Sequence, residues 1–226
     1  MTKENRKYIL PTTYLGNVLY YALLANKSCI IEQHANYIKQ TYANRCTILS
    51  ANGALNLTIP VEKTKEKTPI CDIRIANNDN WQQLHWRAIE SAYNSSPFFL
   101  FFRDEMEIFY SKKWDFLVDF NLEIEDFIIN SLNLRGVDCS ISDNYINCDG
   151  INKIDCKDLI NPKKFCVSLR ENCDTDLSKS INAPYYQLFD QKFGFTPNLS
   201  VIDLLFNMGN EAKIYLKNIG RTLGDF

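Results

Sequence analysis

The chain has 226 residues, of which 46% are hydrophobic and 23% charged, the balance of a folded globular protein. Its net charge of −2 does not indicate a nucleic-acid partner. No stretch approaches the roughly 20 apolar residues of a membrane-spanning helix, and the 8 glycines never cluster as in a phosphate-binding loop. We therefore expect one domain over residues 1–226, with no integral membrane segment and no nucleotide-binding fingerprint.

The first predicted elements are a strand over residues 8–11, a helix beginning near Val18 and a strand over residues 28–33. Short apolar runs on either side of a helical spacing form a β-α-β pattern, which favours a parallel strand pair. Open α/β sheets bind ligands beyond the carboxyl ends of their strands. The polar residues at these ends are Thr12, Thr13, Glu32, Gln33 and His34.

The next elements are predicted to form a hairpin. Asn52-Gly53 is typical of a type I′ turn, and it separates strand-like runs over residues 46–49 and 55–61. A further alternating run over residues 71–75 is expected to extend the same sheet. Together these elements predict an α/β fold with a mixed sheet and helices packed on it. The alternative is an α+β fold with an antiparallel sheet, and the pairing of the first two strands decides between them.

The chain beyond the hairpin is predicted to be mainly helical. One helix carries an apolar stripe and stops before Pro97. Its stripe contains Trp81, Leu84, His85, Ala88 and Ala92, and is widened by Trp86, Ile89 and Tyr93. Capping boxes at residues 104–107 and 200–203 predict two more helix starts, the second helix ending at Gly209. Residues 136–182 lack periodicity and are expected to form an irregular, insert-like segment.

Cysteine spacing bears on metal and disulfide chemistry. The cysteines are Cys29, Cys46, Cys71, Cys139, Cys148, Cys156, Cys166 and Cys173. They form no C-x-x-C pair of the kind that zinc sites use, so neither a metal nor another cofactor is expected. The N-terminus lacks the apolar core and the cleavage site of a signal peptide. We therefore expect a cytoplasmic protein with reduced thiols.

The densest polar and aromatic segment spans residues 32–45. If it is extended, Tyr37 and Lys39 share one face. Lys39 and Arg45 could bind phosphate or carboxylate, Arg45 through two hydrogen bonds, while Tyr37 or Tyr42 stacks on a sugar or a base. The alternative is a polar strand edge that binds no ligand.

Three side chains have both a chemical and a structural interpretation. His85 is a candidate acid–base group because an imidazole titrates near neutrality, but its place on the helical stripe favours a core histidine. His34 follows a strand and is either a ligand contact or a solvated loop residue. Cys46 lies beside Arg45, which would favour the thiolate, and is otherwise a small strand hydrophobe.

Several segments together resemble the WbqC-like protein family. They span residues 10–16, 37–46, 57–61, 81–99 and 198–206. The most specific combination is Lys39 with Asn44-Arg45, followed by Trp81 with His85. Residues 136–182 depart from the pattern of the wider family.

The resemblance implies a transferase that adds an aminoacyl or acyl group to an amino sugar in surface polysaccharide or O-antigen biosynthesis. Its partners would be a nucleotide-linked or carrier-linked sugar and an acyl or aminoacyl donor. By motif position, Lys39, Asn44 and Arg45 would bind phosphate, and His85 would act as a general base in the same pocket. The further substrate-binding candidates are Tyr37, His34 and Gln33. The alternative is a non-catalytic protein of that pathway that binds a glycan or a protein partner.

Overall fold

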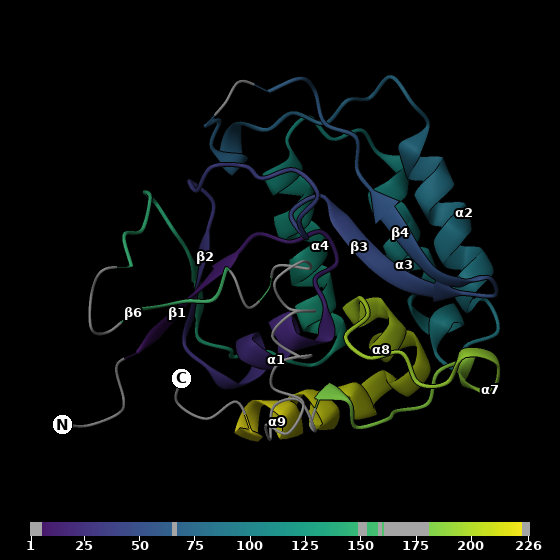
Figure 1. Ribbon diagram of the computed structural model, residues 1–226. Coiled ribbons are helices and arrows are strands. Elements are labelled where there is room, and N and C mark those ends of the chain that lie inside the picture. Colours follow the sequence, from purple (N-terminus) through teal and green to yellow (C-terminus); the bar gives the residue numbers. More distant parts are fainter. Residues whose placement is uncertain (1–5, 65–66, 149–152, 158–159, 161–180, 223–226) are drawn as a thin grey trace.

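The computed structural model describes residues 6–64, 67–148, 153–157, 160 and 181–222 (Figure 1). Its strands are β1 (Lys7–Pro11), β2 (Cys29–Glu32), β3 (Arg45–Ser50), β4 (Gly53–Thr58), β5 (Cys139–Ile141) and β6 (Lys153–Asp155). Its α-helices are α1 (Val18–Asn26), α2 (Trp81–Tyr93), α3 (Phe99–Ser111), α4 (Leu117–Ser131), α7 (Asp190–Phe193), α8 (Val201–Met208) and α9 (Ala212–Thr222). Short 3₁₀ turns are η2 (Ile70–Asp72) and η3 (Gly209–Glu211).

The larger sheet is parallel, with the strand order β5-β2-β1-β6. β1 pairs with β2 in parallel, Leu10 opposite Ile31. This pairing confirms the β-α-β opening and the α/β fold, so the antiparallel alternative is wrong. β5 and β6 pair in parallel on the two outer sides. Both outer strands come from the segment 136–182, which had been expected to be irregular.

Helix α1 connects the two central strands and lies in the core. Its residues from Val18 to Leu24 are all buried, as expected for a helix that is apolar around its whole circumference. Asn17 caps the helix, because its Oδ1 accepts a hydrogen bond from the Tyr20 amide at 2.9 Å. In Figure 1, α1 and α4 are drawn between the parallel sheet and the β3–β4 hairpin, and α9 runs below them.

The predicted hairpin is present, but its turn differs from the prediction. β3 and β4 pair antiparallel, with Ser50 opposite Gly53, so Ala51 and Asn52 form the turn. Gly53 has a positive φ of 103°, while Asn52 does not. A type I′ turn needs positive φ at both central residues, so that turn type is wrong. The geometry fits a type I turn followed by a left-handed glycine.

The strand predicted over residues 71–75 is wrong. Residues Ile70–Asp72 form the 3₁₀ turn η2 instead, directly after Pro69, whose fixed φ suits the start of a helical turn. Only single bridges follow, from Arg74 to Phe116 and from Ile75 to Val61. The segment therefore lies between the chain that follows β4 and the start of α4, and it extends neither sheet.

The helix predicted after residue 80 is α2, with one change to its buried face. Leu84 is 62% exposed, whereas Trp86 and Ile89 are buried with His85. The prediction that Leu84 lies on the buried stripe is therefore wrong, while the burial of Trp86 and Ile89 is as predicted. Among the described residues, no helix is both long and apolar enough to cross a membrane.

The two predicted capping boxes have different outcomes. α3 begins at Phe99, so Asp104 lies inside the helix and the start predicted there is wrong. Ser200 does precede α8, and Gly209 ends that helix, as predicted. The Ser200 hydroxyl, however, donates to the Leu15 carbonyl at 2.8 Å and makes no capping bond. The serine joins α8 to the β1–α1 loop instead.

Candidate functional site

A cavity lies at the carboxyl edge of the parallel sheet. Its wall includes Pro11, which ends β1, and Glu32, which ends β2. Lys157 and Ile160, which follow β6, also line it. The remaining lining residues are Ala35, Asn36, Ile38, Thr41, Tyr42, Ala43 and Ile70. The ligand-binding edge predicted from the β-α-β pattern is therefore hollowed.

The strand order explains this position. From β1 the chain crosses to β2 on one side, while β6 lies on the other side of β1. A sheet of this kind has a crevice at the point where the connections diverge, beyond the carboxyl ends of the strands. Pro11 ends β1 and Lys157 follows β6, the two strands that flank this point, and both residues line the cavity.

The cavity is small and mostly apolar. Its volume is about 100 Å³, and about 10–15 Å³ of such volume admits one water molecule. The charged groups on its wall are the Glu32 carboxylate and the Lys157 ammonium group. Lys157 lies 3.8 Å from Asp155 and over the ring of Tyr145. The cavity therefore combines a cation with space for a few non-hydrogen atoms.

Glu32 and Ser142 join the loops at this edge. Glu32 is 1% exposed and accepts hydrogen bonds from the amides of His34 and Ile146 and from the Ser142 hydroxyl, at 2.6, 2.5 and 3.2 Å. The Ser142 carbonyl accepts from Gln33 Nε2 at 2.8 Å and lies 3.2 Å from His34 Nε2. The structure thus brings the predicted residues Gln33 and His34 together on Ser142.

His34 also contacts a cysteine. Its Nδ1 lies 3.6 Å from the Sγ atom of Cys71. Backbone hydrogen bonds hold this pair in register, because the Cys71 amide donates to the Gln33 carbonyl and the Ile70 amide donates to the Ala35 carbonyl. Both side chains are half-buried. The pair itself does not line the cavity, but its chain neighbours Ala35 and Ile70 do.

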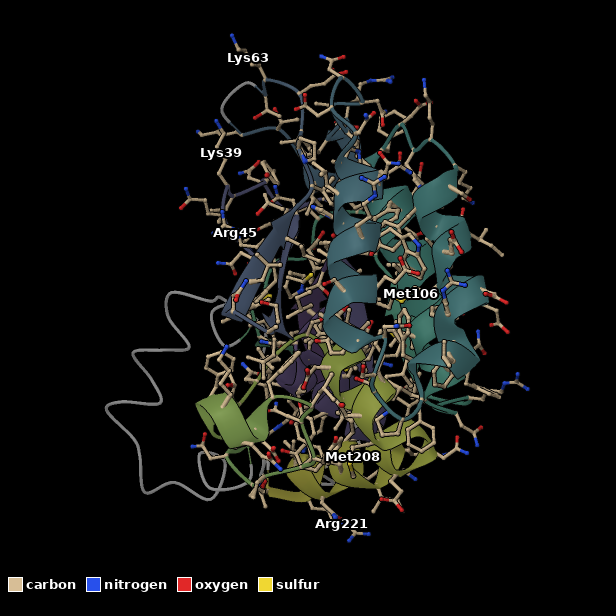
Figure 2. All side chains as sticks on the ribbon, turned by 90° about the vertical axis from the view of Figure 1, so that its right-hand side faces the viewer. Lys39, Arg45, Lys63, Met106, Met208 and Arg221 are labelled. Atoms are coloured by element: carbon tan, nitrogen blue, oxygen red, sulfur yellow. The ribbon has the colours of Figure 1, made fainter. Side chains whose placement is uncertain are left out.

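The segment that carries the predicted phosphate ligands is not extended. Residues 39–44 form turns, with Gln40 at a φ of 62°, so the shared face expected for Tyr37 and Lys39 is wrong. Lys39 is exposed, between Ile38 and Thr41 of the cavity wall. Figure 2 shows Lys39 and Arg45 on the same side of the molecule.

Tyr37, Arg45 and Asn44 differ in what they can offer a ligand. Burial raises the pKa of Tyr37, and the nearby Arg45 guanidinium acts in the opposite direction. Arg45 donates from Nε to the Thr58 hydroxyl at 3.0 Å and stays half-exposed. Asn44 is buried and donates from Nδ2 to the Ile59 carbonyl at 2.9 Å. Asn44 therefore joins this segment to the end of β4, while Arg45 and Tyr37 remain partly accessible.

Comparison with known proteins gives the family. Residues 13–215 match the WbqC-like protein family. The chain belongs to this family. It is also 26% identical over 238 residues to "Uncharacterized protein Rv1507c" of Mycobacterium tuberculosis, a match that covers 92% of this chain and 96% of the relative. No solved structure matches this WbqC-like chain.

His85 lies in the core of the WbqC-like fold. It is 6% exposed, and its Nδ1 lies 2.9 Å from the Tyr14 hydroxyl, which contacts the Tyr110 hydroxyl at 2.9 Å. Burial lowers the pKa of His85 to about 4, while a backbone hydrogen bond with Thr58 acts in the opposite direction. The burial of His85 agrees with its alternative interpretation as a histidine of the core. Neither His85, Lys39 nor Arg45 lines the cavity described above, so the structure gives no support to a shared pocket, and catalysis by His85 stays a prediction.

The six cysteines of the described residues are all free thiols, and three of them, Cys29, Cys46 and Cys156, are buried. Burial raises the pKa of Cys46 well above its usual range, so Arg45 does not stabilise a thiolate there and Cys46 is a strand hydrophobe. Burial likewise raises the pKa of Cys139 and of Cys156 to about 12. Cys166 and Cys173 lie outside the described residues. The described part of the chain holds no group of three or more potential metal ligands.

Sequence reasoning missed Ser142, Cys71 and Lys157. Ser142 follows the three-residue strand β5, which is too short to be predicted in a segment rich in polar residues. The sequence pattern places Cys71 in a strand and assigns no chemical role to its side chain. Lys157 follows the three-residue strand β6. The order of strands in the sheet brings these three residues to one edge. Strand order cannot be read from the local sequence, so their meeting could not be predicted.

Proposed function

We propose that this WbqC-like protein transfers a small acyl or aminoacyl group to an amino sugar during surface polysaccharide or O-antigen synthesis. The observation that carries the proposal is the size and position of the cavity at the sheet edge. Pockets that enclose a drug-sized ligand have volumes of about 300–1,000 Å³, whereas this one has about 100 Å³. Such a space fits an acetyl or glycyl group but not a nucleotide sugar.

The larger parts of the substrates would then lie outside the cavity. Lys157 on its wall and Lys39 on the adjoining turn are cations that suit the phosphates of a nucleotide-linked or carrier-linked sugar. Arg45 adds a planar donor group on the same side of the molecule (Figure 2). In this proposal the sugar stacks on Tyr37 or Tyr42, and the acyl group enters the cavity.

A cytoplasmic location is part of the proposal. Nucleotide-linked sugars and activated acyl donors would meet the enzyme there, and the cysteines of the described residues are free thiols, as is usual in a reducing compartment.

The direct test is a product assay. The purified protein is incubated with a nucleotide-linked amino sugar and an acetyl or glycyl thioester, and the product is followed by mass spectrometry. We expect the sugar amine to gain one acyl group, and we expect saturable thermal stabilisation by donor and acceptor separately. Stabilisation by neither substrate, together with no product, contradicts the proposal.

Charge variants test the phosphate contacts. Lys39→Ala and Arg45→Ala should each weaken binding of the nucleotide sugar about tenfold, while Arg45→Lys should also lose affinity if the contact is bidentate. Arg221→Ala is the matched control, because Arg221 is an exposed cation at the opposite end of the molecule (Figure 2). Equal affinity in all four variants would remove Lys39 and Arg45 from the site.

The second candidate function is non-catalytic binding of a glycan or a protein partner. It is favoured by exposed apolar side chains at the start of α3, where Leu100 is 69% and Phe101 80% exposed. Stabilisation by an oligosaccharide without any effect of the acyl donor would support this candidate. Phe101→Ser should then abolish the stabilisation, whereas an acyltransferase should be unaffected by that change.

A further inference from the structure

Cys71, His34 and Ser142 have the arrangement of a nucleophile, a base and an orienting group. The Cys71 thiol lies 3.6 Å from His34 Nδ1, and the other ring nitrogen lies 3.2 Å from the Ser142 carbonyl. Activated nucleophiles are recognised by such a chain, in which the base is held in turn by a third group. Ser142 is itself fixed, because its hydroxyl donates to the buried Glu32 carboxylate.

The hydrogen bonds also determine which ring nitrogen carries the proton. A backbone carbonyl can only accept, so the neutral His34 ring carries its proton on Nε2 and donates it to Ser142. Nδ1 then has a free lone pair that points at the Cys71 thiol. This is the tautomer in which the imidazole can take the thiol proton.

We propose that Cys71 is the nucleophile that receives the acyl group and that His34 is its general base, an inference that rests on the acyl transfer proposed above. The residues next to this pair line the cavity, Ile70 before Cys71 and Ala35 after His34. Cys71 and His34 adjoin this lining without being part of it, so in this proposal the acyl group lies at the end of the cavity nearest to Ile70 and Ala35. The other thiols of the core, such as Cys46 and Cys156, are buried away from solvent.

The reaction balances with two co-reactants, an activated acyl donor such as a thioester and the amine of an amino sugar. Cys71 Sγ attacks the acyl carbon while His34 Nδ1 takes the thiol proton. The bond from the acyl carbon to the leaving group breaks, and the leaving group receives that proton from His34. The sugar amine then attacks the enzyme thioester, the C–N bond forms, the C–S bond breaks, and Cys71 recovers a proton by way of His34.

The environment of Cys71 explains why a base is needed. Burial raises the pKa of the Cys71 thiol, and the neighbouring Asp72 carboxylate adds to that effect. The resting sulfur is therefore protonated at neutral pH, and attack requires proton removal in the same step. The thiol also lies 3.9 Å from Oδ1 of the exposed Asp72 carboxylate, a longer contact than its 3.6 Å to His34 Nδ1.

The test uses p-nitrophenyl acetate, a small acyl donor of the size that the cavity admits, with the full-length protein. We expect a burst of one p-nitrophenol per chain, a gain of one acetyl group in the intact mass, and acetylation of Cys71 in the peptide map. Cys148 is the internal control, because it is also a half-buried thiol but its sulfur contacts the Ile146 carbonyl and the Asp155 side chain and no histidine. Equal or faster acetylation of Cys148 overturns the proposal.

Two variants separate the roles of the pair. Cys71→Ser should remove the acetyl-enzyme. His34→Gln should slow acetylation of Cys71 about a hundredfold, the lower end of what a positioned general base contributes, and should leave Cys148 unchanged. Iodoacetamide labelling of Cys71 and thermal melting are measured in parallel, so that misfolding is distinguished from lost chemistry. An unchanged acetylation rate in folded His34→Gln protein overturns the assignment of the base.

Failure of this inference can be distinguished from failure of the proposed function. If the amino sugar is acylated at the same rate by Cys71→Ser, the transferase stands and the nucleophile is wrong. If Cys71 is acetylated rapidly but no amino sugar discharges it, the nucleophile stands and the proposed acceptor is wrong.

Discussion

The two histidines of this protein lie in two clusters of polar groups that differ in what surrounds them. His85 faces Tyr14 and Trp81 in the core, where its ring is covered by theirs. His34 instead faces Ser142 and Cys71 at the ends of strands, half-buried and beside a cavity. The first arrangement encloses the imidazole inside the fold, and the second leaves it half-buried, with a backbone carbonyl and a thiol as its partners.

This difference shows why residue type alone is a poor guide to function. Both rings have the same unperturbed chemistry, but desolvation lowers the pKa of His85 to about 4, which keeps it neutral at physiological pH. A neutral ring with enclosed nitrogens contributes packing and hydrogen bonds. For His85 the surroundings, rather than the residue type, therefore determine the protonation state.

Replacing each histidine by alanine should separate the two clusters most strongly. His85→Ala leaves a cavity and removes a partner of the buried Tyr14 hydroxyl, so the free energy of unfolding should fall by about 3–5 kcal/mol. His34→Ala should cost less than about 1 kcal/mol, because the ring is half-buried and contributes little packing. Urea unfolding measures both. Equal losses in the two variants would contradict the comparison.

Glu125 tests how strongly burial acts on the core groups. It lies on α4, is 3% exposed, and accepts a hydrogen bond from the Tyr20 hydroxyl at 2.7 Å. Burial raises its pKa to about 7, with the Tyr20 hydrogen bond acting in the opposite direction. A carboxyl group whose pKa is higher in the folded state stabilises the fold fully below its unfolded pKa of about 4.3, and this contribution is lost as the pH rises through about 7.

The stability difference between the wild type and Glu125→Gln isolates this effect, because His85 and Asp203 titrate in both proteins. From pH 5 to pH 8 the wild type should lose on the order of 2–3 kcal/mol relative to the variant. Unfolding free energies from urea titrations at each pH give the difference. A constant difference over this range would mean that Glu125 is not held in a desolvated environment.

Ser142→Ala acts on the edge cluster. Its effect on stability should be smaller than that of His85→Ala and than the pH-dependent difference at Glu125. The change removes a donor to the Glu32 carboxylate and an acceptor for the Gln33 amide, while the backbone carbonyl that faces His34 remains. The free energy of unfolding should fall by about 1–2 kcal/mol. Thr47→Ala, which removes an exposed bond to Asn56, is the control and should cost less than about 0.5 kcal/mol.

Much of the fold could be predicted from local pattern. The β-α-β opening, the hairpin, α2 and the end of α8 at Gly209 follow from apolar spacing and from residues with restricted conformations. Those signals act over a few residues, so they identify elements but not the order of strands. The turn type failed because Asn52 adopts a negative φ, and the capping box at Asp104 failed because the helix already begins at Phe99.

The candidate site was less predictable because its parts come from distant segments. Glu32, Gln33 and His34 could be placed at a strand end, since that depends only on the β-α-β pattern. Ser142 approaches them through the pairing of β5 with β2, and Cys71 through backbone bonds with Gln33. Neither contact could be predicted from the spacing of residues along the chain.

The parallel sheet also has a consequence for biosynthesis. β1 and β2 are made early, but the strands that cover their outer edges pair Cys29 with Cys139 and Lys7 with Lys153. While the ribosome adds the intervening hundred or so residues, the nascent chain carries two strands with unpaired backbone groups. Such edges are templates for association between chains. Folding of the first half must therefore wait for the second, and we expect chaperones to bind the nascent chain during that interval.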